Sequence, residues 1–127
     1  MVSDFEDLII YQQSRELAKL IYQITNREDF KKDYRFVQQI RAAVGSISDN
    51  IAEGFERQGN KEFCQFLYFA KGSCGEVRSQ INRAYDVDYI DKETYDKVYS
   101  NCRKLSASIL KFIQSIKSFD SKGSKFQ

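Results

Sequence analysis

Four long segments of the chain place apolar residues three and four positions apart, which is the spacing of one face of an α-helix. They run from about Glu6 to Thr25, from Tyr34 to Phe55 or Arg57, from Asn60 to about Tyr85, and from after Asp91 to Phe119. Short polar breaks separate them, and the chain contains no proline. The pattern predicts an all-α fold, an antiparallel up-down-up-down four-helix bundle over residues 1–119, followed by a frayed polar C-terminal tail at 120–127.

The residues expected to face the core form one stripe on each helix. These stripes are Ile10, Ser14, Leu17, Ile21 and Ile24; Val37, Ile40, Val44, Ile47 and Ile51; Phe63, Leu67, Ala70, Cys74, Val77, Ile81 and Ala84; and Tyr95, Val98, Cys102, Leu105, Ile109, Phe112, Ile116 and Phe119. Other large apolar residues lie off these stripes, namely Phe36, Phe55, Phe66, Phe69, Leu110 and Ile113. They indicate either a wide core or a second, intermolecular interface, and the pattern alone does not choose between the two.

Polar residues at the breaks predict where the helices begin. Asp4, Asp33, Asn60 and Asp91 precede helical segments and are suitable N-caps, because their side chains can accept from free backbone N–H groups. Gly59, in the tight break before Asn60, can adopt a left-handed turn conformation.

Composition places the chain among globular proteins, with 42% apolar and 30% charged residues. No apolar run approaches the ~18 residues of a membrane span, and the acidic N-terminus does not have the layout of a signal peptide. The three cysteines lie within helical patterns, and Cys64 and Cys74 are roughly 15 Å apart along one helix, too far for a disulfide. We therefore expect a cytoplasmic protein with buried, reduced thiols.

Positive charge is concentrated at the C-terminal end of the chain. From Lys97 onward there are seven Lys or Arg residues and one acid, whereas the net charge of the whole chain is only +2. Lys97, Lys104 and Lys111 recur every seven residues, and we expect Arg103 and Lys117 to lie beside them. This basic stripe is typical either of a solvated outer face or of a surface that contacts nucleic-acid phosphates.

The second helical segment carries a polar stripe beside its apolar one. It consists of Ser46, Asn50, Glu53 and Arg57, with Glu53 and Arg57 in the order that favours an ion pair. The third segment contains Gly72 and Gly75, which are unfavourable within a helix by roughly 1 kcal/mol each and predict a close backbone approach. Ser73 and Glu76 beside them are expected to face the polar stripe.

Catalytic chemistry has little support in this sequence. The chain has no histidine, so the commonest general base and the commonest metal ligand are both absent. The Glu-x-x-His pairs of a di-iron bundle are absent for the same reason. We predict no enzymatic activity, no cofactor, no metal and no catalytic residue. Glu53 and Glu76 are the carboxylates that a bound metal would have to use.

Two segments resemble a known family closely. QIRA at 39–42 together with SI-x-x-NIAEG-x-x-R at 46–57 is similar to the bacterial four-helix bundle proteins encoded in intervening sequences of 23S ribosomal RNA genes. The resemblance covers about Phe5 to Ile116. The signature residues carried over by position are Arg41, Asn50, Glu53, Gly54, Arg57, Gly72, Ser73 and Glu76. The chain departs from the family pattern at Tyr11, Ser14 and Ala42, where the family usually has Trp, Ala and a second Arg.

The resemblance implies a homo-oligomeric bundle, in some members a ring of five, without a known enzymatic activity. It also implies a similarity to the basic ring-shaped accessory protein of diversity-generating retroelements, which binds nucleic acid and a reverse transcriptase. Two functions follow as alternatives. One is binding of RNA or DNA backbone through Lys97, Lys104 and Lys111, and the other is a protein-interaction scaffold without nucleic acid. In either case we expect Asn50, Glu53 and Arg57 to organise packing between helices or subunits.

Overall fold

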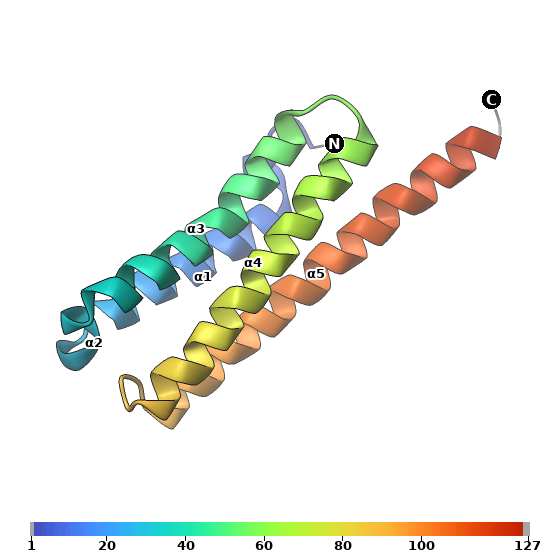
Figure 1. The fold of residues 1–127 in the computed structure, drawn as a ribbon. Helices are drawn as coiled ribbons and strands as arrows, with labels where there is room; N and C mark the ends of the chain where they lie inside the picture. Colours follow the sequence, from blue (N-terminus) through green and yellow to red (C-terminus); the bar gives the residue numbers. More distant parts are fainter. Residues whose placement is uncertain (1, 126–127) are drawn as a thin grey trace.

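The structure, a computed structural model, describes residues 2–125, with side-chain exposure defined for residues 2–121. A short 3-10 helix, η1 (Phe5–Asp7), precedes α1 (Ile9–Thr25), α2 (Glu28–Lys32), α3 (Tyr34–Glu56), α4 (Asn60–Asp86) and α5 (Lys92–Lys125). The four long helices form an antiparallel bundle in which α3 packs between α1 and α4, and α5 lies beside α4 and closes against α1 (Figure 1). The predicted four-helix bundle is confirmed.

The core consists of the predicted stripes with few exceptions. All five expected core residues of α1 are buried, as are the central residues of α3, α4 and α5, and the three cysteines are free and buried. Ile113, which lies off the main stripe of α5, is 0% exposed, as the wide-core alternative predicts, because α5 packs against both α4 and α1. One assignment on α5 was wrong. Phe119, expected in the core, is 71% exposed, because α5 has already passed the start of α1 at that level.

The apolar residues off the stripes divide between core and surface. Phe36 packs on the ring of Phe30 at a centroid distance of 5.0 Å, and Phe55 lies partly buried between the rings of Phe5 and Phe63. Phe69, in contrast, is 59% exposed, and Leu110 also reaches the surface. The wide core therefore accounts for Phe36 and Phe55, whereas Phe69 and Leu110 remain on the surface of the subunit.

The two ends of α1 differ from the prediction. Glu6 does not start a continuous helix, because Leu8 adopts an extended conformation between η1 and α1. Asp4 precedes η1, where its backbone N–H donates to Asp7 Oδ2 at 3.2 Å. The break after α1 contains the unpredicted helix α2, which buries the side chain of Phe30 completely. A single apolar residue in a charged segment gives no helical period, so the sequence pattern could not reveal this helix.

The predicted caps of α3 and α5 are confirmed. Asp33 Oδ1 accepts from the Phe36 backbone N–H at 3.3 Å, and Asp91 Oδ1 accepts from that of Thr94 at 2.8 Å. The cap bond lowers the pKa of Asp91, together with the side-chain hydrogen bond to Thr94. The cap predicted for α4 is wrong. The N-cap position is Gly59, at φ 101° as expected for a left-handed turn, and Asn60 is already helical.

Asn60 instead helps to hold the distal part of α5. Its Nδ2 donates to Asp120 Oδ1 at 2.7 Å, and Lys117 Nζ donates to the Tyr68 hydroxyl at 2.9 Å. These two hydrogen bonds join the start of α4 to α5 near its C-terminal end. The segment predicted as a frayed tail is accordingly helical as far as Lys125, and residues 126–127 lie outside the described part of the chain.

Asp33 joins the start of α3 to the loop between α4 and α5 at one end of the bundle, which leads to a stability prediction. Besides capping α3, its Oδ2 accepts from the Tyr89 hydroxyl at 2.8 Å, and this bond raises the pKa of Tyr89. We expect Asp33→Ala to lower the free energy of unfolding by about 1–3 kcal/mol, because it removes a cap and leaves a partly buried hydroxyl unpaired. Urea denaturation measures the loss. Asp91→Ala, which removes a cap and a local hydrogen bond to the Thr94 side chain but no link between helices, should cost less. An equal loss for both variants would contradict the linking role of Asp33.

No helix in the described residues combines the length and the apolar character that crossing a lipid bilayer requires.

Candidate nucleic-acid interface and polar groove

The first two residues of the polar stripe of α3, Ser46 and Asn50, lie on the side that faces α4. Ser46 Oγ and Ser73 Oγ lie 3.0 Å apart, so the two helices share a hydroxyl hydrogen bond. Asn50 Nδ2 donates to the Ser46 backbone oxygen at 2.8 Å and to Ser46 Oγ at 3.0 Å. Asn50 therefore pairs with Ser46 within α3. The prediction that Ser73 faces the polar stripe is confirmed.

The last two residues of this stripe, Glu53 and Arg57, are exposed. Arg57 Nη2 lies 3.0 Å from Glu53 Oε1, and about half of each side chain is accessible, so the pair contributes only a few tenths of a kcal/mol. Arg57 also lies over the Phe66 ring, 5.2 Å from its centroid. The other signature arginine, Arg41, donates to Thr25 Oγ1 at 3.0 Å and ties α3 to the end of α1. Within one copy of the chain, Arg41 and Arg57 contact neighbouring helices, whereas Glu53 pairs only within α3.

Close helix approach occurs at Gly54 and not at the glycines of α4. A Cβ added to Gly54 would lie 2.7 Å from Phe66 Cβ and 3.0 Å from Phe63 Cδ1. A Cβ on Gly72 or Gly75 would meet no atom within 4 Å, so the predicted backbone approach there is wrong within one copy of the chain.

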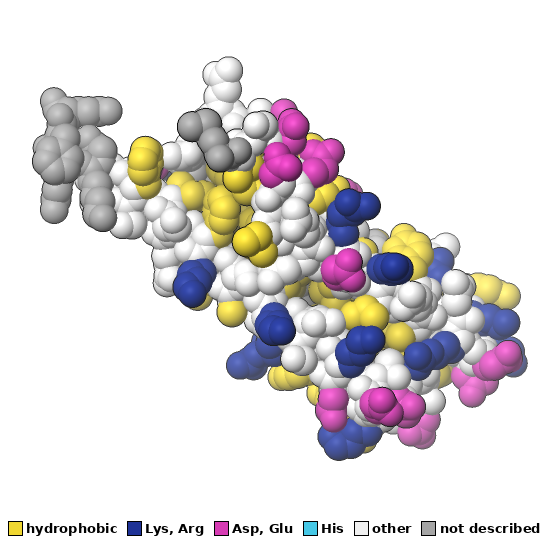
Figure 2. All heavy atoms as spheres, turned by 180° about the vertical axis from the view of Figure 1, so that it is seen from behind, with side chains coloured by type: hydrophobic (Ala, Val, Ile, Leu, Met, Phe, Trp, Pro, Cys, Tyr) yellow, Lys and Arg dark blue, Asp and Glu magenta, His cyan; other side chains and the backbone are white. Residues whose placement is uncertain are grey.

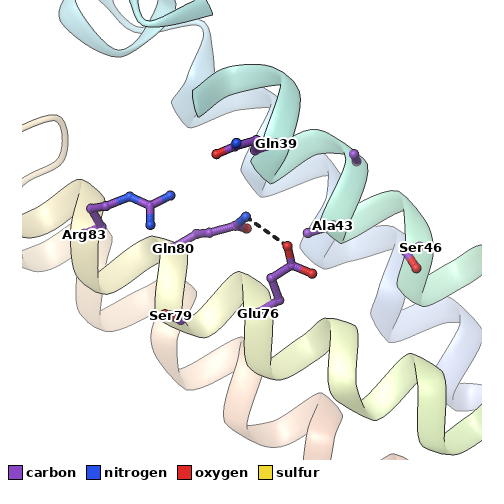
Figure 3. Close-up of a pocket in the computed structure, with 8 residues that line it drawn as sticks. Gln39, Ala43, Ser46, Glu76, Ser79, Gln80 and Arg83 are labelled. Atoms are coloured by element: carbon purple, nitrogen blue, oxygen red, sulfur yellow. Dashed lines mark hydrogen bonds between the residues drawn. The ribbon is translucent and has the colours of Figure 1, made fainter. Parts of the chain in front are cut away.

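A polar groove separates α3 from α4. It encloses about 490 Å³ and is lined by Gln39, Ala42, Ala43, Ser46, Glu76, Ser79, Gln80 and Arg83 (Figure 3). Gln80 reaches across it from α4 and is only 5% exposed. Its Nε2 donates to Glu76 Oε2 over a long 3.4 Å, whereas its Oε1 is buried without a hydrogen-bond partner. An unpaired buried acceptor of this kind typically costs about 1–3 kcal/mol.

The three heptad-spaced lysines of α5 are all exposed. Lys97, Lys104 and Lys111 carry no ion pair within residues 2–121, where the pairs within 4.0 Å are Glu53–Arg57 and Lys92–Asp96. Lys111 borders a groove of about 450 Å³ formed with Leu8, Ile9 and Phe112, which places the row on the α1 side of α5. Their charges are therefore available to an anionic partner.

The two other predicted contacts of this stripe lie elsewhere on α5. Lys117 follows Lys111 by six residues, about 240° around the helix, and its ammonium group contacts Tyr68 of α4 on the opposite edge. Arg103 is exposed but is turned about 100° from Lys104. The expectation that these two residues lie beside the lysine row is wrong, because it ignored their angular positions.

Basic side chains extend over the face that α1 and α5 form together. Figure 2, seen from behind Figure 1, shows Lys and Arg side chains spread along this face, while most of the Asp and Glu side chains in view gather toward its ends. The opposite side of the bundle, formed by α3 and α4, presents the polar groove and the exposed Phe69. The molecule thus has two chemically different sides.

The thiols are poor candidates for chemistry. Burial raises the pKa of Cys74 to about 11 and that of Cys102 to about 12, and it also raises the pKa of Cys64. A thiol of this kind is a weak nucleophile, since the thiolate is the reactive form. Cys74 Sγ lies 3.6 Å from the Cys102 backbone oxygen, within the core contact between α4 and α5. In the described residues, His, Cys, Asp and Glu form no group of three or more that could hold a metal, and Glu53 and Glu76 are not part of one.

Sequence reasoning missed most of the groove. Of its polar lining residues, only Ser46 and Glu76 were singled out individually; Gln39 appeared only within the family motif, and Ser79, Gln80 and Arg83 did not appear. One signal was present, since Gln80 lies next to the core residue Ile81 and three positions after Val77, so that an amide occurs close to the buried face. The groove itself depends on the distance between two helices, which no single-helix pattern specifies.

Comparisons with known proteins give a family and a fold. Residues 6–111 match the family model described as 23S rRNA-intervening sequence protein. A solved structure from Bacteroides thetaiotaomicron VPI-5482, described as a protein with unknown function from the S23 ribosomal protein family, is similar with a TM-score of 0.76 and 22% identity. The match covers 83% of this chain and 98% of that one. A search of curated proteins gave no match. Neither description names an enzymatic activity.

Proposed function

The chain belongs to the 23S rRNA-intervening sequence protein family, and from this premise we propose that it is a non-enzymatic, homo-oligomeric bundle that binds the RNA or DNA backbone. The observation that carries the proposal is the row of exposed lysines on α5, Lys97, Lys104 and Lys111, without ion-pair partners within residues 2–121. Cations on one face suit phosphate contacts, which need charge but no base-specific geometry. The three free thiols fit a reducing compartment, so the same proposal includes a cytoplasmic location.

Self-association is proposed to use the outer face of α4. Phe69, Gly72, Glu76 and Ser79 follow steps of three and four residues and therefore share one side of the helix. Phe69 is 59% exposed. Gly72 weakens the helix, yet a Cβ at this position would meet no atom within 4 Å, so packing within the subunit does not require a glycine here. A second copy packing here would cover Phe69 and use the space at Gly72. The basic side formed by α1 and α5 would remain free, as in the ring of five that the family resemblance implies.

Sedimentation and a salt titration test this function together. The purified full-length chain should sediment as an oligomer, and its binding to a fluorescein-labelled RNA or DNA oligonucleotide should weaken steeply between 50 and 200 mM salt. Binding that does not change with salt, or no binding at low salt, would contradict the phosphate-contact mechanism. A single-copy sedimentation coefficient at all concentrations would contradict the assembly.

Replacing Phe69 separates assembly from folding. We expect Phe69→Glu to shift the sedimenting species from the oligomer to the single copy, because the charge would be buried in the interface. Thermal unfolding should show that the helical content of the subunit is retained, since Phe69 is exposed within it. Phe119→Glu is the matched control, since Phe119 is another exposed phenylalanine but lies on α5. If both variants sediment like the wild type, α4 is not the interface.

A protein partner is the second candidate function, without nucleic acid. The groove of about 450 Å³ between the N-terminal segment and α5 is lined largely by apolar side chains, including Leu8, Phe112 and the 69%-exposed Ile9. Exposed apolar surface of this kind is common at protein interfaces. Affinity capture from nuclease-treated lysate distinguishes the two functions. A specific partner retained by the wild type and lost with Ile9→Glu would favour the scaffold.

A further inference from the structure

The groove between α3 and α4 combines acceptors, one cation and two alanines. Glu76 and Gln80 come from neighbouring turns of α4, Gln39 faces them from α3, and Arg83 lies at the other end of the groove (Figure 3). The buried Ala43 and the exposed Ala42 line the α3 side, so little side-chain volume from α3 fills the space. The lysine row lies elsewhere, whereas Glu76 and Ser79 belong both to this groove and to the outer face of α4, so the two surfaces adjoin.

Gln80 is the second, independent observation. A carboxylate only accepts hydrogen bonds, so the Gln80 NH2 group must be the one facing Glu76, which leaves Oε1 as the unpaired atom. The Gln80 side chain is only 5% exposed, and its Oε1 accepts no hydrogen bond. Buried acceptors without a donor are uncommon in native folds. A donor-rich group that enters the groove would satisfy this acceptor once the Gln80 amide turns toward it.

We propose that this groove binds a guanidinium group, carried either by a free arginine-type molecule or by an arginine side chain of a second copy of the chain. A guanidinium is planar and has five N–H donors. It fits against the two alanines, pairs with both carboxylate oxygens of Glu76, and offers further donors to Gln39 and Gln80. Because Gln80 Oε1 is enclosed, its side-chain torsions must change to present it to the ligand, and this gives up only the 3.4 Å contact with Glu76.

Arg83, at one end of the groove, would determine the orientation of a bound arginine. It follows Glu76 by seven residues, about 10 Å along the helix, and its guanidinium is held 4.5 Å from the centroid of the Phe36 ring. Free arginine can therefore place its guanidinium at Glu76 and its α-carboxylate toward Arg83. This orientation predicts that agmatine, which lacks the carboxylate, binds more weakly than arginine.

Titration with L-arginine, followed by NMR of the Gln80 side-chain amide, tests the site in the full chain. We expect a saturable shift of this signal with arginine and at least a 10-fold weaker effect with citrulline, which has the same shape but a neutral urea group. Glu76→Gln should weaken the shift of the Gln80 amide at least 10-fold. Gln80→Met, which retains similar volume, should weaken the arginine-induced shift of the neighbouring Ser79 backbone amide by the same factor relative to the wild type. No saturable shift, or equal shifts with arginine and citrulline, would overturn the proposal.

Sedimentation in the presence of arginine distinguishes the two sources. If a second copy supplies the guanidinium, which rests on the proposed self-association, then free arginine and Glu76→Gln should both dissociate the oligomer. If the oligomer persists while the Gln80 signal shifts, a free molecule is the ligand. A wild-type chain that sediments as a single copy and still binds arginine would refute the assembly and leave the groove assignment intact.

A tethered guanidinium provides a further control. Ala42 is exposed and lines the groove, so Ala42→Arg can supply the group from the α3 side of the same site. The variant should lose the arginine-induced shift and unfold at a higher temperature than the wild type. Ala42→Gln, of similar length but uncharged, should do neither. Unchanged arginine binding by Ala42→Arg, with the fold intact, would contradict the site.

Discussion

Gly54→Ala is expected to destabilise the bundle, although alanine is the better helix former. The added methyl group would lie 2.7 Å from Phe66 Cβ, an atom fixed by the backbone of α4, and 3.0 Å from Phe63 Cδ1. Relieving this overlap requires α3 and α4 to separate, and overpacking of this kind typically costs about 1–3 kcal/mol. Helix propensity returns about 1 kcal/mol at most. The net loss is then up to about 2 kcal/mol, and we expect the melting temperature to fall by up to about 10 °C in thermal unfolding followed by circular dichroism.

Gly45→Ala is the matched control for this prediction. Gly45 lies in the same helix, and a Cβ there would meet no atom within 4 Å. The substitution should therefore raise stability by about 0.5–1 kcal/mol, the gain of alanine over glycine in a helix. Opposite signs for the two variants would show that contact, not backbone freedom, selects glycine at position 54. If Gly54→Ala were as stable as Gly45→Ala, the close packing of α3 on α4 would be contradicted.

Periodicity predicted the fold because the spacing of apolar residues within each long helix identifies the face of that helix that is buried. The alternation along α1 placed Ile10, Leu17 and Ile24 in the core without any knowledge of the neighbouring helices. The same information is missing where burial depends on which helix lies opposite. Phe119 continues the apolar stripe of α5 but is exposed, because α5 extends past the start of α1. The spacing within α5 contains no information about where α1 begins.

The candidate sites were harder to predict for a related reason. Gly72 and Gly54 are both glycines within helices, and only the positions of Phe63 and Phe66 on the facing helix make one of them a contact. The lysine row could be predicted from its seven-residue spacing. For Lys117, the angular position around the helix had to be calculated to show that it lies away from this row, on the side where it contacts Tyr68. The groove around Gln80 requires two helices at once. Residues that act through one helix were therefore predictable, and those that act between helices were not.

The distribution of charge and apolar surface gives the two sides of the bundle separate roles in the proposed function. The lysine row lies on the side of α5 that borders α1, whereas Phe69 and Gly72 lie on the outer side of α4. Assembly through α4 would bring the lysine rows of several copies onto one particle. Since each neutralised phosphate releases counterions, binding by several copies would strengthen the dependence on salt.

Reversing the three lysines of α5 is expected to have the largest effect on nucleic-acid binding. In the triple variant Lys97→Glu, Lys104→Glu and Lys111→Glu, three attractive phosphate contacts per subunit become repulsive. We expect affinity for the labelled oligonucleotide to fall by about 10²–10³-fold at low salt. The slope of log K against log salt should decrease by about 2–3 for each subunit in contact, since each phosphate contact contributes about 0.7–0.9.

Two further variants separate position from total charge. Lys31→Glu, Lys32→Glu and Lys61→Glu together change the net charge by the same amount, but these lysines lie on α2 and at the start of α4. This control should lose far less affinity, because charges more than a Debye length of about 10 Å from the bound strand are largely screened. Replacing the α5 lysines by glutamine removes attraction without adding repulsion and should give an intermediate affinity. If both glutamate variants bind equally well, net charge alone governs binding and the lysine row is not the interface.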